Sequence, residues 1–154
     1  LRQLAEAGGE TTVLGIWTGA NAVAVLCKEP PGKTVNMTVR IGAALRADSA
    51  QGLCFLTYLD DDAVLTRSLR AAGLDREGFQ SRMAETRQHG YALSDAVLPG
   101  VGAIAAPVFD GTGAIAATVA IVSPLDTLRG DRLAALVTPL LATANTISHQ
   151  LGHS

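Results

Sequence analysis

Two pairs of strand-like segments, each joined by a turn of a few residues, most constrain how this chain can fold. Residues 10–18 and 22–27 are rich in β-branched side chains and flank a short turn at Gly19. Residues 103–109 and 114–122 flank a second short turn that contains two glycines. Turns this short join antiparallel neighbours, because a parallel crossover needs about a dozen residues or more. The pattern therefore predicts an antiparallel sheet.

Other segments complete the predicted order of elements. Residues 34–39 alternate apolar and polar side chains, which predicts a third strand with one apolar face. Three helices should follow: one capped by Asp48 or Ser49, one over 62–69, and one from Asp75 to Gly90. Since strands are followed by helices and then by strands again, the fold class is predicted to be α+β.

The two ends of the chain are both predicted to be helical. Residues 1–9 have the pattern of the end of a linker helix that stops at a glycine pair. The closing helix should begin at Asp126 or Asp131 and bury one apolar stripe, formed by Leu133, Leu136, Val137, Leu140, Ala144, Ile147 and Leu151. Polar residues and a proline interrupt this last segment, so it is not predicted to cross a membrane.

Composition narrows the possible function classes. The 154 residues are 48% apolar and 17% charged, which fits one globular domain rather than a disordered chain. With 12 basic and 14 acidic residues the net charge is −2, so we do not expect this chain to bind DNA by itself. Two cysteines are too few for a disulfide framework, and a reduced cytoplasmic protein is the expectation.

No residue pattern predicts catalysis, a cofactor or a metal. The three histidines are His89, His149 and His153, and the last two flank a glycine near the chain end. Neither cysteine lies beside a histidine, and no Gly-x-Ser-x-Gly motif occurs. We therefore expect a binding domain rather than an enzyme, without a cofactor.

Six short segments together carry a resemblance to a known family: Gly9–Val13, Arg40–Gly42, Ser49–Gly52, Arg87–Ala92, Gly100–Asp110 and Ile147–Gly152. In this order they resemble the effector-binding domain of IclR-type bacterial transcriptional regulators. No single segment carries the resemblance, but together they follow the family order over nearly the whole chain.

The resemblance implies a fold and a role. The fold would be GAF-like, or profilin-like: a curved antiparallel sheet flanked by helices that enclose a pocket for a small metabolite. Residues 10–154 would form one effector-binding domain, with a winged helix-turn-helix domain preceding residue 1. Operator DNA would be bound only through that missing domain, and the regulator would be a homodimer or a tetramer.

The resemblance also implies where an effector would bind. The helix that starts at Ser49 would offer the backbone N–H groups of Ala50 and Gln51 to a carboxylate, as helix N-termini do. The alternative is a plain helix cap, in which Asp48 or Ser49 occupies those groups. The remaining predicted lining is apolar: Met37, Ala44, Leu93, Val101, Ala103, Ala120 and Val122.

The predicted lining points to one class of effector. Burying a polar group without a partner costs about 1 to 3 kcal/mol, so an apolar pocket serves short polar acids poorly. We therefore expect a carboxylate with an aromatic or branched aliphatic body. Two alternatives remain: a dimerisation module whose pocket is filled by its own side chains, and an enzyme on a GAF-like fold.

Overall fold

The computed structural model describes residues 1–154 and confirms the α+β class. Its elements are, in chain order, α1 (Arg2–Gly8), β1 (Thr11–Trp17), β2 (Ala22–Lys28), β3 (Ala44–Leu45), α2 (Ala50–Leu59), α3 (Asp62–Ala72), α4 (Arg76–His89), β4 (Ala92–Ser94), β5 (Val101–Phe109), β6 (Ile115–Pro124), a 3-10 turn (Leu125–Thr127) and α5 (Gly130–Gln150). No helix has the length and the apolar composition needed to cross a membrane.

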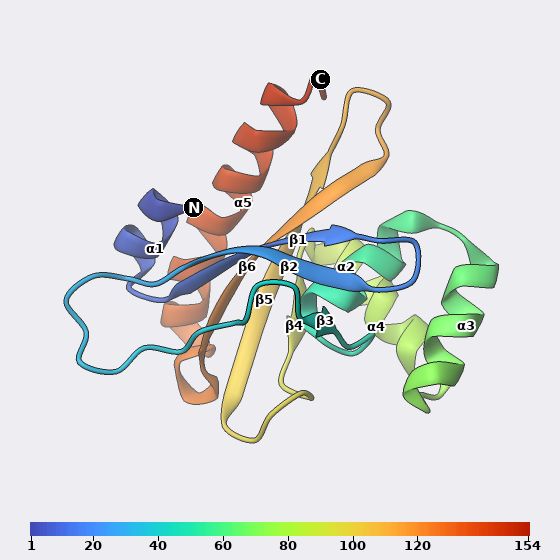
Figure 1. The fold of residues 1–154 in the computed structure, drawn as a ribbon, viewed down its shortest axis with the longest axis horizontal. Helices are drawn as coiled ribbons and strands as arrows, with labels where there is room; N and C mark the ends of the chain where they lie inside the picture. Colours follow the sequence, from blue (N-terminus) through green and yellow to red (C-terminus); the bar gives the residue numbers. More distant parts are fainter.

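All six strands form one antiparallel sheet in the order β3-β2-β1-β6-β5-β4. Both predicted hairpins are present, as β1–β2 and β5–β6. The two hairpins are joined where β1 lies beside β6, with Val13 opposite Ala120. The register shifts after Leu14 in β1 and after Val108 in β5, and such irregularities bend a sheet. The sheet curls into a half-barrel around α2, which confirms the expected curved sheet (Figure 1).

Helices cover both faces of the sheet (Figure 1). On one face α2 contacts β4, β5 and β6, and Phe55 and Leu53 of this helix are almost fully buried. On the other face α5 packs on β5 and β6, and α1 lies against α5 and β1. Each face therefore has its own apolar core, because successive side chains of a strand point to opposite faces.

The predicted strand over residues 34–39 is wrong. The segment between β2 and β3 runs outside the sheet, and only Ala44 and Leu45 pair with β2 (Figure 1). Pro30 and Pro31 follow β2 and lack the N–H groups that would continue the ladder. The segment is instead held where the hydroxyl of Thr11 donates to the carbonyl of Met37. Alternation alone does not make a strand where no neighbouring edge is in reach.

Sequence reasoning also missed β4 and placed one end of the apolar stripe incorrectly. β4 has only three residues, too few to show a period. In α5 Leu136, Leu140 and Ala144 are buried as predicted, but Leu151 follows the end of the helix and is 48% exposed. In that last turn Ser148 is buried instead. Its hydroxyl accepts a hydrogen bond from the N–H of Phe109 at 3.0 Å.

Leu140 and Leu151 give a matched test of the packing of α5. Replacing Leu140, which has no exposed surface, with alanine should cost about 2 to 5 kcal/mol of the free energy of unfolding. Leu151→Ala should change it by less than about 0.5 kcal/mol, since surface substitutions generally do. Urea denaturation followed by circular dichroism measures both. Equal losses would show that the end of α5 packs differently.

Candidate functional site

A cavity of about 470 Å³ lies beside the N-terminus of α2. Its wall is built from the segment before β3, from β3 itself, from the loop that follows β4, and from facing ends of β5 and β6. Seven of the ten residues predicted from the sequence line this one cavity: Met37, Ser49, Ala50, Gln51, Val101, Ala103 and Val122. The pairing of β5 with β6, which sets Ala103 opposite Val122, brings the two strands' contributions together.

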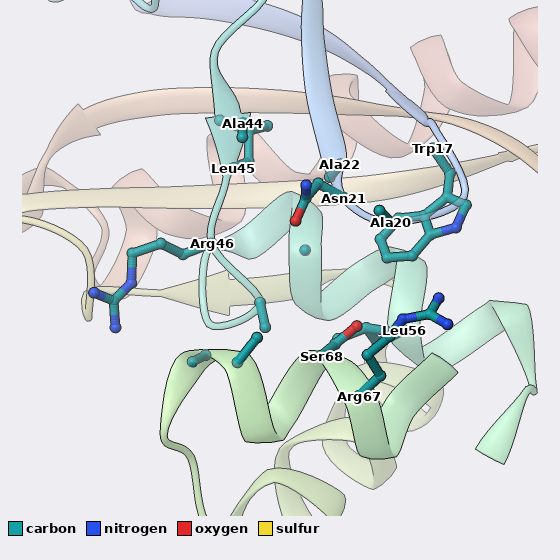
Figure 2. A pocket seen from close by; sticks show the side chains of 14 residues that line it. Trp17, Ala20, Asn21, Ala22, Ala44, Leu45, Arg46, Leu56, Arg67 and Ser68 are labelled. Atoms are coloured by element: carbon teal, nitrogen blue, oxygen red, sulfur yellow. The ribbon is translucent and has the colours of Figure 1, made fainter. Parts of the chain in front are cut away.

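The structure places the other three predicted residues elsewhere. Ala44 lines a different cavity on the far side of β3 (Figure 2). Leu93 is exposed and borders a small pocket beside α4, because neighbouring residues of β4 point to opposite sides. Ala120 is buried in the core that α2 covers, between Val13 and Ala105.

The start of α2 is capped by one side chain only. Ser49 has the extended backbone of an N-cap residue, and its hydroxyl accepts from the N–H of Gly52 at 3.0 Å. The N–H groups of Ala50 and Gln51 have no hydrogen-bond partner, although both residues border the cavity. Two free donors at the positive end of a ten-residue helix suit an anion.

The carboxylate of Asp48 does not compete for those donors. Its two oxygens accept from Nε and Nη2 of Arg46, at 2.8 and 3.0 Å. The hydrogen bonds from Arg46 are the main reason that the pKa of Asp48 is lowered. The main-chain carbonyl of Asp48 also accepts a hydrogen bond from the hydroxyl of Ser94. Asp48 therefore shapes the loop before α2 and leaves the helix N-terminus open.

The side chain of Gln51 is also committed elsewhere. It is buried against β6, where its Nε2 donates to the hydroxyl of Thr118 at 2.9 Å. Gly15 on β1 leaves room for this contact, since a Cβ there would lie 2.6 Å from the same nitrogen. The Nε2 of Gln51 is thus held on β6, while its main-chain N–H stays free beside the cavity.

Sequence reasoning missed three polar residues of the cavity wall: Thr38, Arg40 and Ser94. Arg40 is exposed and is the only charged residue that lines the cavity, so the wall carries a positive charge and no acidic side chain. Arg40 belongs to a segment that carried the resemblance, but nothing in the sequence placed it beside Ala50. Ser94 lines the cavity where Leu93 was expected, and the register of the short β4 decides between the two. No group of three or more metal-ligating side chains is present.

Comparison with known proteins gives matches to bacterial transcriptional regulators. The family model for the bacterial transcriptional regulator IclR C-terminal domain matches residues 1–149. The HTH-type transcriptional regulator BhcR of Paracoccus denitrificans is 32% identical over 163 residues, covering 96% of this chain and 56% of that protein. The chain thus spans little more than half the length of this curated relative.

Solved structures agree on the fold. A protein assigned to the ICLR transcriptional regulators, from Silicibacter sp. TM1040, superposes with a TM-score of 0.91 at 22% identity, over 100% of this chain and 64% of that one. An IclR regulator from Alicyclobacillus acidocaldarius gives 0.87 at 28% identity, covering 98% and 64%. HmgR of Pseudomonas aeruginosa gives 0.88 at 27% identity, covering 99% and 64%.

The third residue of α2 tests how the helix start is built. A Cβ on Gly52 would lie 2.1 Å from the carbonyl oxygen of Arg46, so Gly52→Ala must displace the loop and should cost about 1 to 3 kcal/mol of stability. Gly78 is the third residue of α4, with the same N-cap hydrogen bond from its N–H, here to Asp75, and an added Cβ would make only an ordinary contact with the Asp75 carboxylate at 3.4 Å. Gly78→Ala should stabilise by about 0.5 to 1 kcal/mol. Thermal unfolding of both variants measures the contrast, and a stabilising Gly52→Ala would contradict this packing.

The pair of Arg46 and Asp48 should make stability depend on pH. Arg46→Met leaves a carboxylate only 7% exposed without its partner, which should cost about 1 to 3 kcal/mol at pH 7. Since the pKa of Asp48 is lowered in the folded protein, this stabilisation is complete above the usual Asp pKa of about 4 and is lost as the pH falls through the lowered value.

Urea denaturation at pH 7 and near pH 3 measures that dependence. Arg129→Met is the control, because Arg129 is exposed and forms no ion pair. The cost of Arg46→Met should shrink at the lower pH, whereas the control should stay near zero at both. A cost for Arg46→Met that does not change with pH would mean that the ion pair is not its source.

Proposed function

This chain belongs to the IclR family of bacterial transcriptional regulators, as their C-terminal domain, and we propose that it senses a small organic acid for such a regulator. Members of the family regulate transcription and are not enzymes. Binding of operator DNA is assigned in this proposal to a winged helix-turn-helix domain outside the chain, and the near-neutral charge agrees with that division. Such a regulator would assemble as a homodimer or a tetramer.

The observation that carries the proposal is the pair of free N–H groups of Ala50 and Gln51 at the cavity wall. A carboxylate accepting from both would complete the start of α2 and would face the positive end of its dipole. Arg40 adds a cation at the same cavity, and no acidic side chain opposes it. The effector is accordingly an anion.

The rest of the cavity wall sets the body of the effector. Side chains of Met37, Val101, Ala103 and Val122 are apolar, and the loop after β4 adds Val97 and Leu98. A volume of about 470 Å³ lies within the roughly 300 to 1,000 Å³ of ordinary small-molecule sites. These properties favour an aromatic or branched aliphatic acid. They also favour a sensor over a dimerisation module whose own side chains fill the pocket.

Contacts outside the cavity wall link the segment between β2 and β3 to the end of α1 and offer a route for the signal. Glu10, almost fully buried, has Lys33 Nζ at 3.5 Å and Arg132 Nη2 at 3.7 Å. The same Arg132 guanidinium donates to the carbonyl of Gly8 at the end of α1. An effector that moves the segment before β3 would thereby act on the helix that leads toward the DNA-binding domain. Signalling further requires that two arrangements of the protein bind the effector with different affinities.

A thermal-shift screen with aromatic, branched and short polar carboxylates tests the proposal. At about 100 times its dissociation constant, a ligand adds roughly 2.7 kcal/mol, which raises the melting temperature of a domain of this size by several degrees. Benzoate and branched aliphatic acids should give this shift, and short polar acids should give less at equal concentration. Tighter binding of the short acids at this cavity would contradict the proposed lining.

Two substitutions of Ala50 isolate the main-chain donor. Ala50→Pro removes the N–H at the first helical position, where proline is well accommodated, and should abolish most of the shift. Ala50→Gly retains the N–H and should preserve it. A shift that survives in the proline variant would mean that the carboxylate is held elsewhere. No shift for any acid in the panel would favour the dimerisation module.

A further inference from the structure

The outward face of α5 carries no charge over most of its length, unlike the other long surface helices. Between Arg132 and His149 the sequence of α5 contains no charged residue, whereas α3 and α4 carry charged side chains along their length. The solvent-facing side of a surface helix normally has charged or polar side chains. α5 lies along one side of the molecule, with α1 beside it (Figure 1). Its outward face therefore has the composition of a packing surface.

Small side chains make up most of this face. Its exposed residues include Ala134, Ala135, Thr138, Ala142 and Thr146. The hydroxyl of Thr138 donates to the carbonyl of Ala134 at 3.3 Å, and that of Thr146 donates to the carbonyl of Ala142 at 2.9 Å. Both hydroxyls are thus satisfied within the helix. Side chains this small allow a second helix to approach to an interaxial distance of about 8 Å.

Two polar groups of the same face have no partner within the chain. Pro139 has no N–H, so the main-chain carbonyl of Ala135 lacks the donor that normally bonds to it one turn further along the helix. The side-chain amide of Asn145 is exposed and makes no hydrogen bond with the protein. One of these groups is an acceptor and the other a donor, so they complement each other.

A second α5 helix, packed antiparallel about a twofold axis at the level of Leu140, brings complementary groups together. Ala135 and Asn145 each lie five residues from Leu140, so the free carbonyl of one copy faces the amide of the other. Asp131 and His149 each lie nine residues from Leu140, and neither forms an ion pair within the chain. The carboxylate of one copy thus faces the imidazole of the other. Helices that cross at about 20° stay close enough for both contacts.

We propose that two copies of this chain dimerise through this face, by antiparallel packing of their α5 helices. This inference rests on the homodimer of the proposed function and names its contact surface. Because α5 and α2 cover opposite faces of the sheet, the dimer leaves the effector cavity open. Since α1 packs on α5, the dimer contact also supports the helix that leads toward the DNA-binding domain.

Sedimentation velocity over a range of micromolar concentrations tests this proposal. The wild-type chain should dimerise. Ala142→Glu should weaken dimerisation at least about tenfold, because it sets two like charges beside the twofold axis. Ala84→Glu is the matched control, since Ala84 is an exposed alanine in the middle of α4, and it should leave the dimer unchanged. Circular dichroism checks that both variants are folded.

A reversal of charge tests the contact between the helix ends. Asp131→Lys should weaken the dimer a few-fold, because it removes the carboxylate that faces His149 of the second copy. Adding His149→Asp should restore dimerisation, since the pair then forms again with opposite signs. Both substitutions oppose the dipole of their own helix, so effects within one helix would add rather than cancel. Failure of the double variant to recover would contradict the antiparallel register.

Disulfide cross-linking between copies measures the register directly. In a Cys27→Ser background, a mixture of Thr138→Cys and Ala142→Cys chains should cross-link under mild oxidation, because each position lies two residues from the axis. A mixture of Thr138→Cys and Ala84→Cys chains should not. The proposal is overturned if the chain stays monomeric throughout the concentration range, or if Ala142→Glu dimerises as the wild type does. Either result leaves the effector site, which the thermal-shift screen tests, untouched.

Discussion

The antiparallel pairing of β1 with β6 is the contact on which the rest of the fold depends. It joins an N-terminal hairpin to a C-terminal hairpin, and it sets Val13 opposite Ala120 beneath α2. Both cores rest on the sheet that this pairing completes, one under α2 and one under α5. The cavity beside α2 depends on it as well, because its wall combines a segment that follows β2 with residues of β5 and β6.

The loop between β3 and α2 has the second organising role. Arg46 and Asp48 hold it by paired hydrogen bonds, Ser94 ties it to β4, and Gly52 lets it approach the helix more closely than any side chain would allow. As a result the helix starts with two N–H groups unused. The strand before this loop, β3, separates the cavity beside α2 from the cavity that Ala44 lines, and Leu45 borders both. A ligand in the cavity beside α2 would therefore contact a wall shared with its neighbour.

Local patterns predicted those parts of the fold whose cause is local. The two hairpins, the N-cap at Ser49 and the helices after it followed from β-branched runs, short turns and capping residues, and all are present. The strand at 34–39 failed, since a strand needs a partner edge that alternation cannot reveal. In the candidate site, residues predicted on β5 came together, whereas Leu93 and Ala120 did not, because strand register and depth beneath a helix are set by distant neighbours.

The sequence by itself determined the α+β class, the antiparallel hairpins and the likeness to IclR-type effector-binding domains, since short turns and ordered motifs are properties of neighbouring residues. Only the tertiary structure decided that Arg40 and Ser94 join Ala50 at one cavity, and that the side chain of Gln51 turns to Thr118 on β6. The physical reason is that these contacts link segments far apart in the chain, and their geometry follows from packing and register across the sheet rather than from any local preference.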